Sequence, residues 1–157
     1  MAQRYIANTA ILFKLEDVIG TDAAPAGATD AVLVTDFTVT PFAAQNVERK
    51  FIRPYFGGYG QMVNTASVKI SFGVELGGSG TAGTAPQWGD MLIACGHSEA
   101  IKATPDSVEY TPISTDIKTA TIYYYDDGVL HKVLAAVGNV KLSAPVGDRG
   151  KLSFEFT

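Results

Sequence analysis

The sequence predicts a mainly β fold with a single helix, and three observations lead to this expectation. Hydrophobic and polar residues alternate with a period of two through most of the 157 residues, as in strands that bury one face. Clusters of Gly, Pro, Asp and Ser separate these segments and are typical of turns. A helical period occurs in one stretch, at about Pro86 to Cys95. We therefore expect about eight strands and one helix.

The strand with the clearest alternation is SVKISFGVEL, residues 67–76. Its apolar positions, expected to face the core, are Val68, Ile70, Phe72, Val74 and Leu76. The C-terminal segment KLSFEFT repeats the pattern and predicts three inward-facing residues, Leu152, Phe154 and Phe156. Segments rich in β-branched and aromatic residues predict further strands at 11–16, 31–40 and 47–55.

The segments between the strands contain typical turn residues. Residues 119–136 predict a β-hairpin, because Asp127-Gly128 can supply the positive φ angles of a tight turn. Residues 20–30 are rich in Gly, Ala, Pro and Asp and predict a long exposed connection. Residues 54–61, PYFGGYGQ, combine aromatic residues with glycines and predict a mobile loop that can make contacts.

The predicted helix begins after Thr84, a suitable N-cap, and has Pro86 in its first turn, where a missing N–H does least harm. Gly96 is expected to end it at the C′ position. Its apolar stripe consists of Trp88, Met91, Leu92 and Cys95. The helix should pack on a sheet, and Cys95 is then a core residue rather than a reactive thiol.

Bulk composition limits the class of protein. The length suits one domain, and 46% hydrophobic with 18% charged residues indicates a globular chain. No apolar run is long enough to span a bilayer, and the N-terminal segment lacks the features of a signal peptide. A lone cysteine fits a reducing compartment. The net charge of −4 argues against a dedicated nucleic-acid-binding protein.

Gly78, Gly80 and Gly83 form a G-x-G-x-x-G pattern between a strand and the predicted helix. A dinucleotide site is disfavoured, because Pro86 removes an N–H from the helix start and no second βα unit follows. The preceding strand also alternates, whereas a strand of a covered parallel sheet would be continuously apolar. We therefore interpret this segment as a flexible linker.

Other chemistry is not indicated either. His97 and His131 lack further ligands at zinc-like spacing, and the Asp126–Gly128 segment lacks the other oxygen ligands of a calcium loop. No serine lies in a nucleophile-elbow context. We expect no enzyme activity, no cofactor and no metal. A small basic cluster at Arg49, Lys50 and Arg53 is either a solvated strand face or an ion-paired subunit contact.

Several separated blocks resemble the tail tube proteins (major tail proteins) of long-tailed, siphovirus-type bacteriophages. The most specific block is GSGTAGTAPQWG followed by LIACG, and a second is the YDDGVLHK hairpin. Further matching blocks are ILFKLEDVIGTDAAPAGATDAVLVTDFTVTP, VERKFIRPYFG and VEYTPIS. The similarity extends from about Ala10 to Thr157.

This resemblance implies a β-sandwich or partly closed barrel with one flanking helix, in a single tail-tube domain spanning 1–157 without an immunoglobulin-like extension. Family members form hexameric rings that stack into a hollow tube, through which DNA passes into the host without specific binding. The implied partners are copies of the chain itself and other tail proteins. The implied location is the virion tail, after assembly in the host cytoplasm and without membrane insertion.

Exposed sheet edges in a small β protein can be covered by identical neighbours, which favours self-association. The candidate contacts between subunits or rings are Tyr55, Phe56, Tyr59, Arg49, Lys50 and Arg53. The candidate lumen-facing residues are Lys69, Ser71 and Glu75. Two alternatives stay open: a monomeric carbohydrate-binding β-sandwich using surface tyrosines Tyr123 and Tyr125, and a tube protein of a related secretion or injection device.

Overall fold

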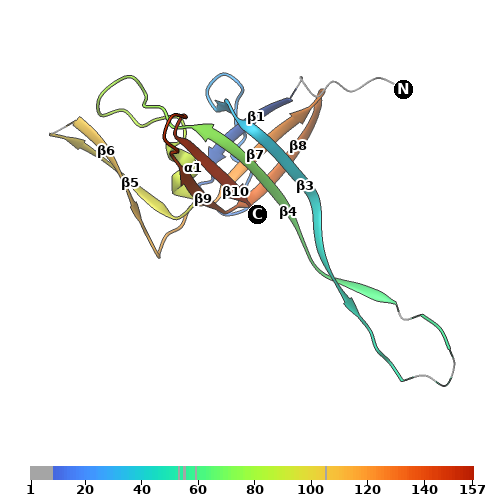
Figure 1. The fold of residues 1–157 in the computed structure, drawn as a ribbon. Helices are drawn as coiled ribbons and strands as arrows, with labels where there is room; N and C mark the ends of the chain where they lie inside the picture. The colour runs from blue at the N-terminus through green and yellow to red at the C-terminus, as the bar shows by residue number, and fades with distance from the viewer. Residues whose placement is uncertain (1–8, 53, 55, 59, 105) are drawn as a thin grey trace.

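The computed structural model describes residues 9–52, 54, 56–58, 60–104 and 106–157. These residues form ten strands and one short helix (Figure 1), which confirms the mainly β class. The elements are β1 Thr9–Leu15, β2 Ala31–Val32, β3 Thr35–Glu48, β4 Gln61–Glu75, α1 Gly89–Ala94, β5 His97–Ala103, β6 Asp106–Pro112, β7 Ala120–Asp126, β8 Val129–Ala136, β9 Gly138–Ser143 and β10 Lys151–Phe156.

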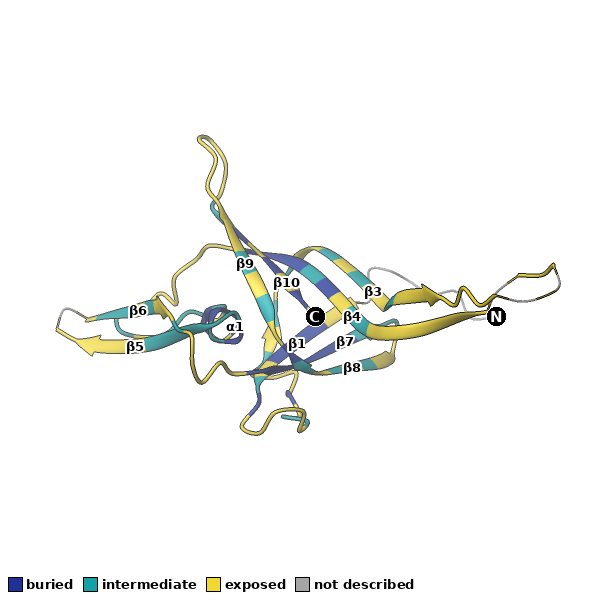
Figure 2. Cartoon of the chain, turned by 90° about the horizontal axis from the view of Figure 1, so that it is seen from below, coloured by how far each residue is buried: buried dark blue, intermediate teal, exposed yellow. Residues whose placement is uncertain are grey.

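Two four-stranded antiparallel sheets form a sandwich. The first has the strand order β2-β1-β7-β8 and the second β3-β4-β10-β9, while β5 and β6 form a separate hairpin. Aromatic rings fill the space between the sheets: the ring centroids of Phe13 and Phe156 are 5.3 Å apart, and those of Phe37 and Tyr124 are 5.8 Å apart. The buried residues therefore lie in the sandwich, whereas both hairpins that leave it are mostly exposed (Figure 2).

The predicted alternation is confirmed in the two central strands of the second sheet. Ile70, Phe72 and Val74 are buried, as are Leu152, Phe154 and Phe156. The prediction that Leu76 faces the core is wrong: it lies just beyond the end of β4 at Glu75, and its side chain is 47% exposed. The predicted hairpin is also confirmed, with Asp127 at φ +48° and Gly128 at φ +83° in the turn between β7 and β8.

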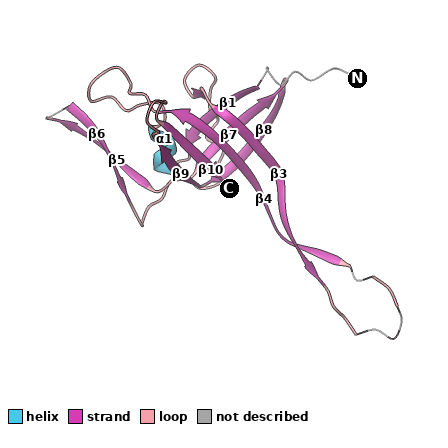
Figure 3. Cartoon of the chain, viewed as in Figure 1, coloured by secondary structure: helices cyan, strands magenta, loops and turns pink. Residues whose placement is uncertain are grey.

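The helix is shorter than the sequence predicts (Figure 3). It spans six residues, Gly89–Ala94, so the prediction of about Pro86 to Cys95 is wrong at its N-terminus. Thr84 does not cap it; the N-cap is Trp88, without a capping side-chain hydrogen bond, and a turn precedes it in which the N–H of Gly89 donates to the carbonyl of Pro86. Gly96 has φ +79° just after the helix, as expected for C′.

The strand prediction has further errors. The strand predicted at 31–40 is divided between β2 and β3. Of the strand predicted at 47–55, residues 47 and 48 form the end of β3, while 49–52 and 54 are outside any strand, and 53 and 55 lie outside the described residues. The hairpin of β5 and β6 and the strand β9 were not predicted. β5 and β6 show no regular alternation of buried and exposed residues, and in β9 only Gly138 and Val140 are partly buried.

The connection at residues 20–30 is not simply exposed. Pro25 is buried. The Asp22 carboxylate accepts a hydrogen bond from the Tyr123 hydroxyl and forms an ion pair with the Lys132 ammonium at 2.8 Å. The side chain of Tyr123 is only 5% exposed, on the face of the first sheet that points away from the core. The connection therefore covers part of that face.

A buried carboxylate anchors the start of this connection. Glu16 is 3% exposed and accepts four hydrogen bonds, from the hydroxyls of Thr119 and Thr121 and from the N–H groups of Gly20 and Ala135. Ala135 has φ +56° in the irregular part of β8. Glu16 thus joins β1, the connection, β7 and β8 at one end of the first sheet.

Candidate assembly surfaces

The most prominent surface feature is an arm formed by β3 and β4 beyond the sandwich (Figure 1). The pairing of these strands has register shifts between Thr40 and Ala43 and between Gln45 and Asn46, and such bulges bend and twist a hairpin. From Gln45 to Glu48 in β3 and from Gln61 to Ala66 in β4, every residue is exposed. The hairpin thus presents both faces of its outer half to solvent.

The arm tip, residues 49–60, has a distinctive composition. It contains Arg49, Lys50 and Arg53 and no acidic residue, although the whole chain has a net charge of −4. The guanidinium of Arg49 contacts the Met62 sulfur at 2.9 Å, and Lys50 is exposed. Ile52 and Phe56 are fully exposed. The predicted contact residues Arg53, Tyr55 and Tyr59 lie outside the described residues. Of the six predicted contact residues, the structure therefore describes Arg49, Lys50 and Phe56.

The second candidate surface is the face of the sheet β3-β4-β10-β9 that points away from the core. The side chains of Lys69, Ser71 and Glu75 alternate in β4 with buried residues and lie on this face. Cross-strand pairing places Glu155 beside Ser71 and Lys151 beside Glu75. A shallow groove of about 220 Å³ crosses the same face and is lined in part by Ser71, Asn139, Lys141, Ser153 and Glu155.

Charges on this face are balanced. The Glu75 carboxylate accepts a hydrogen bond from the Arg149 guanidinium to each of its oxygens, at 2.8 and 3.0 Å. Lys151 forms an ion pair with Asp36, and the pKa of that carboxyl is lowered by the hydrogen bond from Lys151. The remaining positions are mostly hydroxyl and amide side chains. The face is polar without a strong excess of either sign.

The borders of this sheet are open. Its outer strands are β3 and β9, and within the described residues each of them pairs on one side only. Their unpaired N–H and C=O groups form a template for another strand. An isolated chain therefore presents two strand edges that a neighbour can cover. The sequence predicts exposed sheet edges but does not indicate which strands form them, because β9 was not recognised.

The hairpin of β5 and β6 projects from the helix end of the sandwich (Figure 1). Trp88 and Tyr110 anchor it, with ring centroids 5.6 Å apart, and the Tyr110 hydroxyl donates to the Glu99 carboxylate at 2.7 Å. Burial and the nearby Glu99 raise the pKa of Tyr110. The hairpin is thus held at its base, and Ile101 is exposed in its outer part.

The cysteine and the two histidines, side chains that often serve catalysis or ligand binding, make contacts within the subunit. Burial raises the pKa of Cys95 to about 12, which agrees with a core cysteine. His131 stacks on Tyr124 at 4.5 Å, and His97 contacts the Leu92 carbonyl. Among the described residues no group of three or more His, Cys, Asp or Glu side chains could hold a metal ion. Tyr123 is buried, so its prediction as a surface tyrosine for carbohydrate binding is wrong.

The glycine-rich segment is a loop between β4 and α1. Gly80 and Gly83 have φ angles of +82° and +72°, and the Trp88 indole N–H donates to the Gly77 carbonyl at 2.8 Å. The helix starts only at Gly89 and has six residues. The segment therefore lacks the direct glycine-to-helix junction of a dinucleotide site.

The comparison with known families decides the identity. The profile of the phage tail tube protein family matches residues 6–157, nearly the whole chain. The chain belongs to the phage tail tube protein family. The resemblance to tail tube proteins inferred from the sequence blocks is thus confirmed at the level of the family. The tail tube chain has a structural role in the virion tail, where family members associate with one another and with other tail proteins.

The family is structural rather than enzymatic in character. No curated protein matches the sequence of the tail tube chain. Within the described residues, no helix combines the length and apolar character needed to cross a membrane.

Proposed function

We propose that six copies of this chain close into a ring, and that stacked rings form the hollow tail tube through which phage DNA enters the host. This proposal rests mainly on the sheet β3-β4-β10-β9, which has open borders at β3 and β9 and a polar outer face. Covering both borders requires a neighbour on each side, and a closed ring provides this without leaving an edge.

The direction of the strands supports such closure. All pairs in this sheet are antiparallel, so β3 and β9 run in opposite directions. Rotation about an axis roughly along the strands preserves these directions. β9 of one subunit can therefore pair with β3 of the next as another antiparallel pair, and alternation continues around the ring.

The size of the resulting barrel also fits. Four strands from each of six subunits give about 24 strands. With a spacing of about 4.8 Å and a tilt of about 40°, the circumference is about 150 Å and the backbone diameter about 48 Å. Side chains occupy part of this width, and the remaining lumen has room for one DNA duplex.

The outer face of the sheet then lines the lumen, with Lys69, Ser71 and Glu75 among its residues. A strongly basic wall would bind phosphates through many contacts and hold the DNA. Here ion pairs neutralise Glu75 and Lys151, and hydroxyl and amide groups dominate the remainder. Such a wall suits passage of DNA without specific binding.

The arm tip supplies contacts between subunits or rings. Phe56 and the neighbouring Tyr55 and Tyr59 are suited to anchoring, since aromatic side chains bury a large area at a small entropy cost. Arg49, Lys50 and Arg53 add positive charge at the same place. The exposure of Phe56 in the isolated chain supports this role.

Electron microscopy of the purified full chain tests the proposal. We expect rings or tubes of uniform diameter without any added partner. A protein that stays monomeric at high concentration would contradict the proposal.

A variant with Tyr55, Phe56 and Tyr59 replaced by serine tests the arm separately. It should fold and polymerise poorly, whereas Ile101→Ser, a matched change of an exposed apolar residue on the other hairpin, should still form tubes. Unimpaired tubes from the arm variant would remove the arm tip from the interface.

A further inference from the structure

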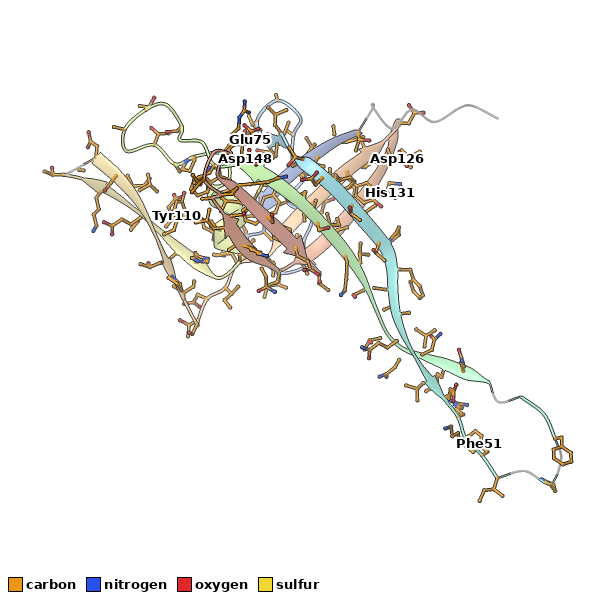
Figure 4. The ribbon with its side chains drawn as sticks, viewed as in Figure 1. Phe51, Glu75, Tyr110, Asp126, His131 and Asp148 are labelled. Carbon is orange, nitrogen blue, oxygen red and sulfur yellow. The ribbon has the colours of Figure 1, made fainter. Side chains whose placement is uncertain are left out.

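The ion pair between Lys151 and Asp36 connects β10 with β3 across the strand β4 that lies between them. Lys151 begins β10 and lies on the outer face of the sheet, since it is followed by the buried Leu152. Its cross-strand neighbour is Glu75, labelled in Figure 4 at the end of the hairpin opposite the arm tip. Both oxygens of the Glu75 carboxylate already accept hydrogen bonds from Arg149. The Lys151 ammonium instead donates to the Asp36 carboxylate, so its side chain crosses the width of β4.

Gly73 makes room for this crossing. It lies in β4 between the buried Phe72 and Val74, so a side chain at this position would stand on the outer face. A Cβ on Gly73 would collide with the Lys151 Cε and would lie 2.8 Å from Thr35 Oγ1. The lysine stem therefore lies against the sheet over Gly73, and its charge stays close to the wall that the sheet forms.

A β-bulge directs Asp36 toward this lysine. In β3 the two residues Asp36 and Phe37 together face the single residue Phe72 of β4. Asp36 has φ +53°, a conformation that Asp and Asn adopt more readily than most other residues. Phe37 stays on the core side, with its ring centroid 5.8 Å from that of Tyr124. The bulge thus places the Asp36 carboxylate on the outer face without removing Phe37 from the core.

In the proposed tube, the outer face of this sheet lines the lumen. Each subunit then contributes one Lys151 at the same height of the wall, so a ring of six subunits carries a band of six ammonium groups. Free ammonium groups in such a band would bind the phosphates of a DNA duplex through several contacts at once. The Asp36 side chain is 76% exposed and that of Lys151 34%, so the carboxylate is the more accessible member of the pair.

We infer that Asp36 is a positioning residue that keeps the Lys151 ammonium from binding DNA phosphates, and that it thereby determines the affinity of the lumen for DNA. Without the Asp36 charge, each subunit gains one uncompensated positive charge at this height, and a ring gains six. Glu75 cannot compensate for the loss, because its single negative charge is already paired with Arg149. The inference rests on the proposed tube and adds the residue that controls how its wall meets DNA.

Asp36→Asn tests this role, because asparagine keeps the size of the side chain and tolerates a positive φ but carries no charge. Tubes of the variant are pelleted with a fluorescent DNA duplex of about 20 base pairs in about 50 mM salt, and should retain roughly tenfold more duplex than parent tubes. With two phosphate contacts per duplex, the affinity should fall about 60-fold between about 50 and 500 mM salt. The retained duplex should resist a nuclease fixed to beads, which cannot enter the lumen.

Two further variants separate Lys151 from other causes. Adding Lys151→Gln to Asp36→Asn removes the freed ammonium group, so the amount of nuclease-resistant duplex should return to the level of the parent tubes. The matched control is Glu109→Gln, which frees Lys102 from an exposed ion pair of 2.6 Å on the hairpin β5–β6, outside this sheet. It changes the net charge by the same amount and should retain no more nuclease-resistant duplex than the parent.

Asp36→Asn tubes that retain no more nuclease-resistant duplex than the parent or than Glu109→Gln would overturn the inference and leave the proposed function standing. Retention that persists after Lys151→Gln is added would overturn it as well, because the responsible charge would then lie elsewhere. Absence of rings and tubes from the parent chain would refute the proposed function itself, and the inference with it.

Discussion

Glu16 offers the sharpest test of how the subunit is stabilised. Its carboxylate lies 3% exposed between four donors: Thr119 Oγ1 at 2.6 Å, Thr121 Oγ1 at 2.8 Å, Gly20 N–H at 2.8 Å and Ala135 N–H at 2.9 Å. Each carboxylate oxygen accepts one hydroxyl and one N–H. The substitution Glu16→Gln retains the size of the side chain and turns one of these oxygens into an NH₂ donor.

The amide cannot satisfy this site. A threonine hydroxyl can rotate and accept from the new NH₂ group, but the backbone N–H on that side has lost its acceptor and faces a second donor. An unsatisfied buried N–H costs about 1–3 kcal/mol, and the lost charge weakens the two remaining hydrogen bonds by about 1 kcal/mol. We expect Glu16→Gln to lower the free energy of unfolding by about 2–4 kcal/mol.

Urea denaturation of the subunit under dissociating conditions measures this loss. The matched control is Glu75→Gln, which removes an exposed carboxylate paired with Arg149 and should change the free energy of unfolding by less than about 1 kcal/mol. Equal effects of the two substitutions would refute the argument from the buried hydrogen bonds.

The pH dependence gives a second check. Burial raises the pKa of Glu16, but the hydrogen bonds from Thr119, Ala135, Gly20 and Thr121 outweigh it, and the net pKa is below the ordinary value of 4.5. Because the folded pKa is lowered, this stabilisation is fully present above about pH 4.5 and is lost as the pH falls through the folded pKa. The difference between the parent chain and Glu16→Gln should therefore shrink below pH 4.5. A constant difference down to pH 2 would contradict the assignment.

Two further predictions concern single close contacts. Gly138→Ala would place a Cβ 2.5 Å from the ring of Phe156 and should destabilise the subunit by about 1–3 kcal/mol in urea denaturation, whereas Gly57→Ala, with open space around it, should be neutral; equal stability of the two variants would refute the packing argument. Trp88→Phe removes the indole N–H that donates to Gly77 and should speed amide hydrogen exchange in the loop before α1 without changing that of the sandwich strands; unchanged exchange in the loop would contradict this role.

The sequence predicted those parts of the fold in which local pattern and burial agree. Phe72 and Phe154 alternate with polar residues and lie in the core of the second sheet, and Asp127-Gly128 forms the predicted tight turn. The family could also be inferred, because its specific blocks are contiguous in the sequence.

The errors have physical causes. The helix is short because residues 86–89 form a turn, closed by the hydrogen bond from the Gly89 N–H to the Pro86 carbonyl, although Trp88 fits the apolar stripe and packs against Tyr110. The arm could not be predicted, because β3 beyond the sandwich has no buried face, and alternation is visible only where one face is buried. β9 was missed because it is short and only Gly138 and Val140 are partly buried, while its other residues are exposed.

The candidate site shows the same division. The composition of the arm tip and the polar face of β4 could be predicted from the sequence, since each depends on residues within one short segment. The open borders depend on which strands become neighbours. That information lies in pairings between distant residues, such as Thr35 with Gly73, and no local pattern contains it.

A cryo-electron microscopy reconstruction of tubes from the purified full chain, at a resolution that separates strands, tests the central claim most directly. We predict one continuous antiparallel barrel around the lumen, in which β9 of each subunit pairs with β3 of the next. A tube whose lumen is lined by other elements, or whose β3 and β9 edges stay unpaired between subunits, would contradict the account.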